Sequence, residues 1–233
     1  MIKETSKRIL SKTIRLLFDN KLAKCTVSIL LMTLTCQAIY PQSKYFVKDK
    51  EGFDFILNVN RDGNTINGFT REKALLDYTS KISYQIMKAA SSLKHPEIIR
   101  FNANLVNNKF EGNYDYLFTS YKVVGNITGD SIFYSVYDKN NKLCRDYKGV
   151  KVTDFNRKDY GKLAGEVIKI TEDNIFDPQI IQSDKWRKFK EKLVNVAPNI
   201  ADDLEFQIGF FALARGFDFT HYYIVKNATP TDI

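Results

Sequence analysis

Apolar and polar residues alternate with a period of two over the middle of the chain, which is typical of half-buried β-strands. The expected strands are Ile98–Leu105, Lys109–Leu117, Ser120–Thr128, Ser131–Asp138 and Lys142–Val152. Because only two or three residues separate each strand from the next, the pattern predicts an antiparallel meander rather than a βαβ array. In the fourth strand, Ile132, Tyr134 and Val136 share one face, and Phe133 and Tyr137 share the other.

A hairpin and a helix are expected before the meander. Phe53–Asn60 and Thr65–Phe69 flank Asp62-Gly63, a dipeptide that favours a tight turn between antiparallel strands. The period then changes to that of a helix, which Thr70 would cap and which ends before Pro96. The residues expected on its buried face are Leu75, Tyr78, Ile82, Ile86, Ala89 or Ala90, and Leu93.

The last third of the chain has helical spacing. One helix is expected from Tyr160 to Ile175, and a second follows Ser183 and turns Trp186, Phe189 and Leu193 inward. A third begins at Asp202 and Asp203, buries Leu204, Ile208 and Phe211, and ends at Gly216. Phe217–Lys226 then reads as a strand.

These elements predict an α+β fold. It would contain a small antiparallel β-meander with one long helix, followed by a three-helix segment and a final strand. Residues 39–153 would form the sheet region and residues 154–233 the helical segment, either separately or around one shared core.

Residues 1–38 have the pattern of a secretory signal peptide. Basic residues precede the uncharged stretch 25–36, and Ala38 offers a small residue for cleavage. Twelve residues of helix cover about 18 Å, which is short of the ~30 Å hydrocarbon core of a bilayer. We therefore expect cleavage after Ala38 and a periplasmic, cell-envelope or extracellular protein. An uncleaved anchor, a misplaced start codon and lipidation at Cys36 are the alternatives. We expect membrane attachment only through an uncleaved signal or lipidation at Cys36.

Most of the net positive charge of the chain lies in residues 1–38, and this changes which partner the charge indicates. The chain carries 35 Lys and Arg against 27 Asp and Glu, a formal charge of +8, but seven of the basic and only two of the acidic residues lie in residues 1–38. The remainder is nearly neutral, so we expect no nucleic-acid partner. The run 185–190 mixes Lys, Arg, Trp and Phe, but at helical spacing its basic residues form a solvated helix face. Cys144 is the one cysteine after the expected cleavage, so an intramolecular disulfide is not expected.

One arrangement of residues suggests catalysis. Gly129-Asp130-Ser131-Ile132 and Asp218-Phe219-Thr220-His221 resemble two sequence blocks of GDSL-type esterases. The resemblance implies Ser131 as nucleophile, His221 as base and Asp218 as its orienting carboxylate. The other blocks of that family are missing, and Gly129-Asp130 also fits a two-residue hairpin turn. We therefore expect no catalytic residue, no cofactor and no metal ion.

Four segments in order carry a second resemblance: 168–178, 186–189, 202–206 and Phe219–Tyr223. Together with the meander, they resemble the region before the catalytic domain in secreted bacterial tail-specific (C-terminal-processing) serine peptidases. The Ser and Lys that act in that family lie in the following domain, and no match to them is found here. The resemblance implies a non-catalytic accessory region, truncated or stand-alone, whose partner is a protease domain, and a structural role for His221. The alternative is an independent envelope module that binds a peptide or protein through its sheet or aromatic residues.

Overall fold

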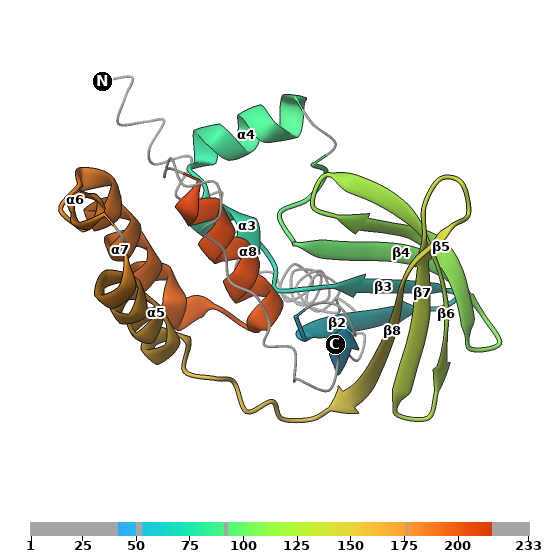
Figure 1. Cartoon of the computed structure of the whole chain (residues 1–233). Coiled ribbons are helices and arrows are strands. Elements are labelled where there is room, and N and C mark those ends of the chain that lie inside the picture. Colours follow the sequence, from blue (N-terminus) through green and yellow to red (C-terminus); the bar gives the residue numbers. More distant parts are fainter. Residues whose placement is uncertain (1–41, 50–52, 91–92, 176, 216–233) are drawn as a thin grey trace, which may run out of the picture. The chain divides into compact units, whose positions relative to one another are not determined.

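The computed structural model describes residues 42–49, 53–90, 93–175 and 177–215 of the 233-residue chain (Figure 1). The predicted signal peptide and the predicted strand 217–226 lie outside these residues. All described residues belong to one compact unit, Pro41–Ile233.

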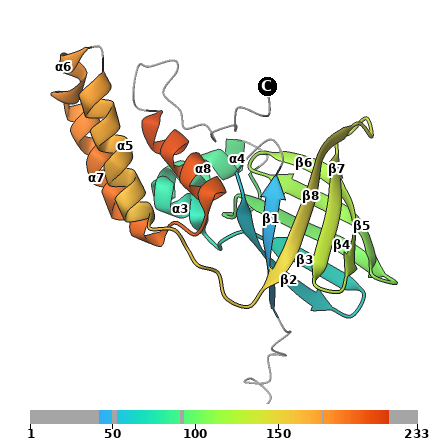
Figure 2. The same ribbon diagram turned by 60° about the horizontal axis from the view of Figure 1, so that its bottom comes forward.

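A closed barrel of eight antiparallel strands forms the larger part of the described structure. Each strand pairs with its neighbours in the sequence, and β1 also pairs with β8, with Phe46 opposite Val150. Figure 2 shows β1 between β2 and β8. The strands are β1 (Ser43–Asp49), β2 (Phe55–Asp62), β3 (Thr65–Phe69), β4 (Ile99–Val106), β5 (Lys109–Tyr116), β6 (Thr119–Thr128), β7 (Ser131–Tyr137) and β8 (Leu143–Val152).

Helices connect β3 to β4 and follow β8. They are α3 (Ala74–Tyr78), α4 (Lys81–Ala90), α5 (Tyr160–Asn174), α6 (Pro178–Ile181), α7 (Asp184–Val196), the short 3₁₀ helix η1 (Ala197–Asn199) and α8 (Asp203–Ala214). Trp186, Phe189 and Leu193 are buried in a second hydrophobic cluster formed by the helices, as the sequence predicts. Phe211 was expected to be buried, but it is 55% exposed.

The predicted fold class is wrong, because the sheet is a closed eight-stranded barrel rather than a small meander. The five strands predicted between residues 98 and 152 begin and end within about two residues of β4–β8. The prediction missed β1, whose pairing with β8 removes both edges of the sheet. The predicted three-helix segment is also wrong, since it contains α6 and η1 as well.

The predicted long helix is two short ones. Thr79 has an extended backbone between α3 and α4, and the Ser80 hydroxyl accepts a hydrogen bond from the Ser83 amide at the start of α4. This break changes the buried face: Ile82 is 74% exposed, whereas Tyr84 is buried. Thr70 does not cap a helix, because its hydroxyl accepts hydrogen bonds from the amides of Ile98 and Ile99.

Alternate residues of every strand point into the barrel. Phe101 and Phe110 stack there with ring centroids 5.6 Å apart, and two inward glycines make room for them. A Cβ atom on Gly68 would overlap the Phe101 ring, and one on Gly125 would overlap the Phe110 ring and the carbonyl oxygen of Phe133. The aromatic rings therefore fill this part of the lumen only because two strands carry no side chain beside them.

We predict that Gly125→Ala destabilises the protein, because the new methyl group meets a backbone carbonyl that cannot move away. The expected loss in the free energy of unfolding is about 2–3 kcal/mol, the upper range for overpacking a core. Urea denaturation would measure it. Gly165→Ala in α5 is the control, because a Cβ there meets nothing within 4 Å and alanine favours helix, so this variant should gain about 0.5–1 kcal/mol. An unchanged unfolding midpoint for Gly125→Ala would contradict the described packing.

Candidate functional site

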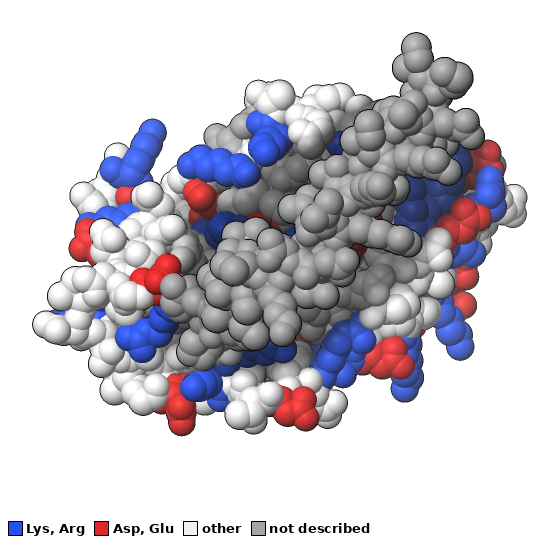
Figure 3. Space-filling view, turned by 180° about the vertical axis from the view of Figure 1, so that it is seen from behind, with Lys and Arg blue, Asp and Glu red and all other residues white. Residues whose placement is uncertain are grey.

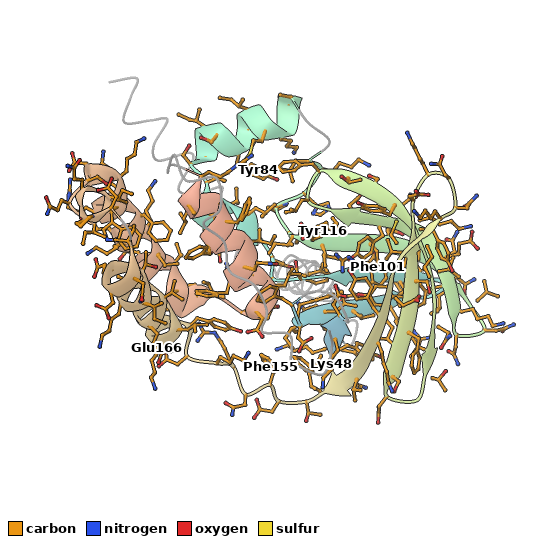
Figure 4. The ribbon with its side chains drawn as sticks, viewed as in Figure 1. Lys48, Tyr84, Phe101, Tyr116, Phe155 and Glu166 are labelled. Atoms are coloured by element: carbon orange, nitrogen blue, oxygen red, sulfur yellow. The ribbon has the colours of Figure 1, made fainter. Side chains whose placement is uncertain are left out.

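A cavity of about 310 Å³ lies at the end of the barrel where β1, β5 and β7 finish and β2, β4, β6 and β8 begin. We call it the mouth cavity. Its floor lies above the packed phenylalanines: in Figure 4, Tyr116 lies nearer the helices and Phe101 deeper in the barrel. Its walls are made of the aromatic residues Phe53, Phe55, Tyr114, Tyr116, Tyr121 and Tyr147, the aliphatic residues Ile99, Val136 and Leu204, and the polar residues Asp49, Cys144, Arg145 and Gln207.

The alternation of the strands brings the tyrosines together. Tyr114 and Tyr116 occupy consecutive inward positions of β5, Tyr121 faces Tyr114 from β6, and Tyr147 comes from β8. The ring of Tyr147 also stacks on that of Tyr134, with centroids 4.8 Å apart. Strands β5, β6 and β8 therefore supply the tyrosines that line the mouth cavity, and Tyr134 of β7 lies against Tyr147 outside the lining.

The tyrosine hydroxyls are only weakly engaged with one another. The hydroxyls of Tyr114 and Tyr147 are 3.5 Å apart, at the long limit of a hydrogen bond. The buried hydroxyl of Tyr134 has no hydrogen-bond partner within the described residues. Because buried hydroxyl groups normally find a partner, these groups have unused capacity to donate or accept.

Burial controls the protonation of these hydroxyls. It raises the pKa of Tyr147 to about 12, with a smaller contribution from the nearby negative charge of Asp49. Burial also raises the pKa values of Tyr114, Tyr116 and Tyr134. The hydroxyls are therefore neutral at physiological pH, and the surroundings oppose negative charge.

One ion pair lies at the rim of the mouth cavity. Arg145 Nη1 is 3.0 Å from Asp49 Oδ2, and both residues occupy inward positions of neighbouring strands, β8 and β1. The Asp49 side chain is 10% exposed, whereas that of Arg145 is 42% exposed. The pair is thus set at the boundary between the lumen and solvent, and its two charges compensate each other.

Helix α8 supplies one wall of the mouth cavity through Leu204 and Gln207, and buried polar groups hold it there. Asp202 caps the helix: one carboxylate oxygen accepts from the Glu205 amide at 2.9 Å, and the other accepts from the Ile56 amide of β2 at 3.0 Å. One side chain therefore starts the helix and ties it to the barrel.

A second contact fixes the orientation of α8 against α3. The buried carboxylate of Glu205 forms an ion pair with Arg71 and accepts a hydrogen bond from the Tyr78 hydroxyl at 2.7 Å. Gly209 lies against the Tyr78 ring, where a Cβ atom would overlap it. The close approach and the charged hydrogen bonds together define how α8 sits on α3.

A separate group of polar residues surrounds His95, which lies just before β4. Its Nδ1 is 3.2 Å from Glu97 Oε2, and its Nε2 is 3.8 Å from Asp115 Oδ2, but neither contact meets the geometry of a hydrogen bond. Burial tends to raise the pKa of Glu97, but His95 and Arg100 lower it, and the net shift is downward. The nearby Ser120 hydroxyl donates to Asp115 rather than to His95, and it accepts a hydrogen bond from Lys94 Nζ at 3.1 Å, so Ser120 is not paired with His95.

Of the three residues proposed for esterase chemistry, Ser131 alone lies within the described residues. Ser131 begins β7 at the end of the barrel away from the mouth cavity, next to the Gly129-Asp130 turn. Asp218 and His221 lie outside the described residues, so their relation to Ser131 stays a prediction. Within the described ranges, no three His, Cys, Asp or Glu side chains are placed to hold a metal ion.

Sequence reasoning missed the mouth cavity. In the sequence, the mouth cavity is indicated by tyrosines at alternate positions of predicted strands, such as Tyr114 and Tyr116. Closure of the sheet is needed to show that these side chains point inward, because an open sheet has two faces that the sequence does not distinguish. The prediction that Ile132, Tyr134 and Val136 share a face is confirmed, since all three are buried while Phe133 is 37% exposed.

The outer surface shows a mixed charge distribution. In Figure 3, basic and acidic side chains are interspersed over the described part of the face shown. No helix in the described part of the chain combines the length and apolar character needed to cross a membrane.

No family model matches the chain, and no curated protein or solved structure matches it. The class of protein is therefore defined by its fold and site. It is a closed up-and-down β-barrel with an aromatic mouth and attached helices. The resemblance to tail-specific serine peptidases stays a prediction.

We predict that the stability of the protein depends on pH through Asp202, the capping carboxylate of α8. Burial raises the pKa of Asp202 to about 7, and the backbone hydrogen bonds that lower it only partly offset that effect. The pKa of Asp202 in the folded protein lies above its value of about 4 in the unfolded chain. The stability linked to this group is therefore complete below about pH 4 and is lost as pH rises towards 7. We expect this loss to be about 2–4 kcal/mol between pH 4 and pH 7.

Urea denaturation at several pH values would test this, with Asp202→Asn as the variant. Its amide cannot ionise, so the difference in stability between pH 4 and pH 7 should shrink relative to the native chain, although the variant is less stable at pH 4. Asp177→Asn alters the exposed N-cap of α6 and should keep the native pH dependence. Identical pH profiles for native and Asp202→Asn proteins would contradict the assignment.

Proposed function

We propose that this chain is a non-catalytic binding module whose barrel holds one small ligand in the mouth cavity. The observation that carries the proposal is the cavity itself, about 310 Å³ of space inside a barrel whose opposite half is filled by side chains. Ligand sites in proteins begin at roughly 300 Å³, and eight-stranded barrels of other proteins hold one small ligand in this way.

The chemistry of the walls supports binding rather than a reaction. Aromatic and aliphatic side chains supply most of the lining, and a few polar groups converge on the space between them. Among the described lining residues there is no histidine, serine or lysine to act as base or nucleophile. The thiol among the described lining residues, that of Cys144, donates to the Lys142 carbonyl oxygen at 3.6 Å.

A small ligand is favoured over a folded protein partner because the cavity is small and recessed in the mouth of the barrel. Leu204 and Gln207 of α8 close one side of it, and the buried residues Phe55 and Tyr114 close others. A peptide would therefore reach the mouth cavity only through a single side chain, whereas a molecule of one or two rings fits inside.

We also propose that the module works outside the cytosol, in the periplasm, the cell envelope or the extracellular space. The basic residues of positions 1–24 and the uncharged stretch 25–36 support this, since that order is typical of exported chains. A barrel core that relies on packing alone suits a chain with one cysteine after Ala38.

A cavity-blocking variant tests the binding function. We expect the purified chain to change the fluorescence of the two-ring fluorophore 1-naphthylamine, of its anionic relative 5-aminonaphthalene-1-sulfonate, or of both. Gln207→Trp should weaken dye binding about tenfold or more, because the indole fills the mouth at a half-buried position and a loss of ~1.4 kcal/mol is already tenfold. Fluorescence titration measures the dissociation constants.

Phe211→Trp is the matched control, since it adds the same side chain to an exposed position of the same helix. It should bind the dyes as the native chain does, and circular dichroism would verify that both variants are folded. If neither dye responds to the native chain, or if Gln207→Trp binds as tightly as Phe211→Trp, the proposed function is wrong.

A further inference from the structure

The chemical class of the ligand follows from the dimensions and charges of the mouth cavity, and this inference rests on the function proposed above. The volume limits the size first. At about 310 Å³, the mouth cavity is roughly twice the ~150 Å³ apolar cavity that accepts a benzene molecule. A ligand of one or two rings therefore fits, whereas a long acyl chain or a larger ring system does not.

The walls favour a flat aromatic molecule. Tyr114 and Tyr121 meet edge to face with centroids 6.4 Å apart, and Phe55 meets Tyr147 edge to face at 5.7 Å. These rings therefore present both faces and edges to the space that they line. Aromatic ligands bind such walls through offset stacking and edge-to-face contacts.

The tyrosine hydroxyls in and beside the mouth cavity indicate which polar group the ring of the ligand must carry. The hydroxyls of Tyr114 and Tyr147 are joined by one long contact, and the hydroxyl of Tyr134, on the ring stacked against Tyr147, has no partner within the described residues. These hydroxyls are protonated at neutral pH, and burial raises their pKa values further, which opposes any negative charge in the cavity. A ligand with a hydroxyl or carbonyl oxygen could accept a hydrogen bond from the Tyr147 hydroxyl, which otherwise has only the long contact with Tyr114 among the residues that the structure describes.

The charges of the site exclude charged ligands of either sign. The surroundings that oppose tyrosinate also oppose a carboxylate in the lumen, and Arg145 is already held by Asp49 at 3.0 Å. A cation would find tyrosine rings and Asp49, but it would meet the positive charge of Arg145 at the same place. Among the described residues that line the mouth cavity, Asp49 and Arg145 carry the charges, and these are equal and opposite, so neither sign of ligand charge is favoured.

We propose that the mouth cavity binds an uncharged aromatic molecule of one or two rings that carries a hydroxyl or carbonyl oxygen, with Tyr147 as the residue that hydrogen-bonds to it.

A matched series of two-ring probes tests the charge and the polar group separately. The probes are 1-naphthol, 1-naphthoate, (1-naphthylmethyl)trimethylammonium and 1-methylnaphthalene, measured by calorimetric titration of the purified chain at pH 7. We expect 1-naphthol to bind about tenfold or more tightly than either charged probe. Tyr147→Phe should weaken 1-naphthol about fivefold, as expected for one lost hydrogen bond, and should leave 1-methylnaphthalene unchanged.

Tyr137→Phe is the control, because it removes the same hydroxyl from a tyrosine that does not line the mouth cavity. If a charged probe binds as tightly as 1-naphthol, if Tyr147→Phe weakens both uncharged probes equally, or if no probe binds although the dyes do, this inference is wrong while the binding function stands. If the dyes also fail to bind, the binding function is wrong, and the inference fails with it.

Discussion

The pairing of β1 with both β2 and β8 is the interaction on which the described structure depends. It joins the first described strand to one that begins about a hundred residues later, and it leaves no unpaired sheet edge in the barrel. Closing so long a loop costs conformational entropy, and the buried inward faces of the strands repay it. Without this pairing the tyrosines of β5, β6 and β8 would lie on an open sheet rather than around a space.

The interior is divided by the size of its side chains. Inward glycines let Phe101 and Phe110 stack across one half of the lumen, so that half is filled. In the other half, tyrosines from several strands leave a cavity of about 310 Å³, and α8 closes one side of it. The same alternation of strand residues thus produces both the packed core and the mouth cavity. The packed half is the one in which inward glycines make room for the phenylalanine rings.

Helix α8 links the barrel to the helical part of the described chain. Leu204 belongs to the barrel core, whereas Phe206 and Phe210 belong to the helical cluster. The carboxylates of Asp202 and Glu205 satisfy backbone amides and Arg71 in a buried setting, where an unpaired charge would be costly. The wall that α8 provides is therefore held by specific polar contacts as well as by apolar packing.

Local patterns predicted the strands but not the barrel. The strands from β4 to β8 follow from alternation and short polar turns, which are properties of neighbouring residues. The pairing of Phe46 with Val150 has no local signal, and β1 lies beside the expected cleavage point, where a further strand was not anticipated. The break at Thr79 was hidden because the apolar spacing from Leu75 to Ile86 fits one continuous helix.

The candidate site was harder to predict than the fold. The residues around Ser131 suggest catalysis because they match a short catalytic block. In the structure, Ser131 lies next to a hairpin turn at the end of the barrel away from the mouth cavity. The residues that line the cavity are common tyrosines and one ordinary ion pair, whose importance comes only from the closed geometry. Tyr114 and Tyr147 are 33 positions apart in the sequence, and barrel closure brings their hydroxyls into contact.

The most direct test of the account is the nuclear Overhauser contact between β1 and β8 in isotope-labelled protein. The account predicts backbone proton contacts between Phe46 and Val150 and between Lys48 and Lys148, alongside those that join β1 to β2. Contacts from β1 to β2 alone, with none to β8, would mean an open sheet and would contradict both the barrel and the cavity at its mouth.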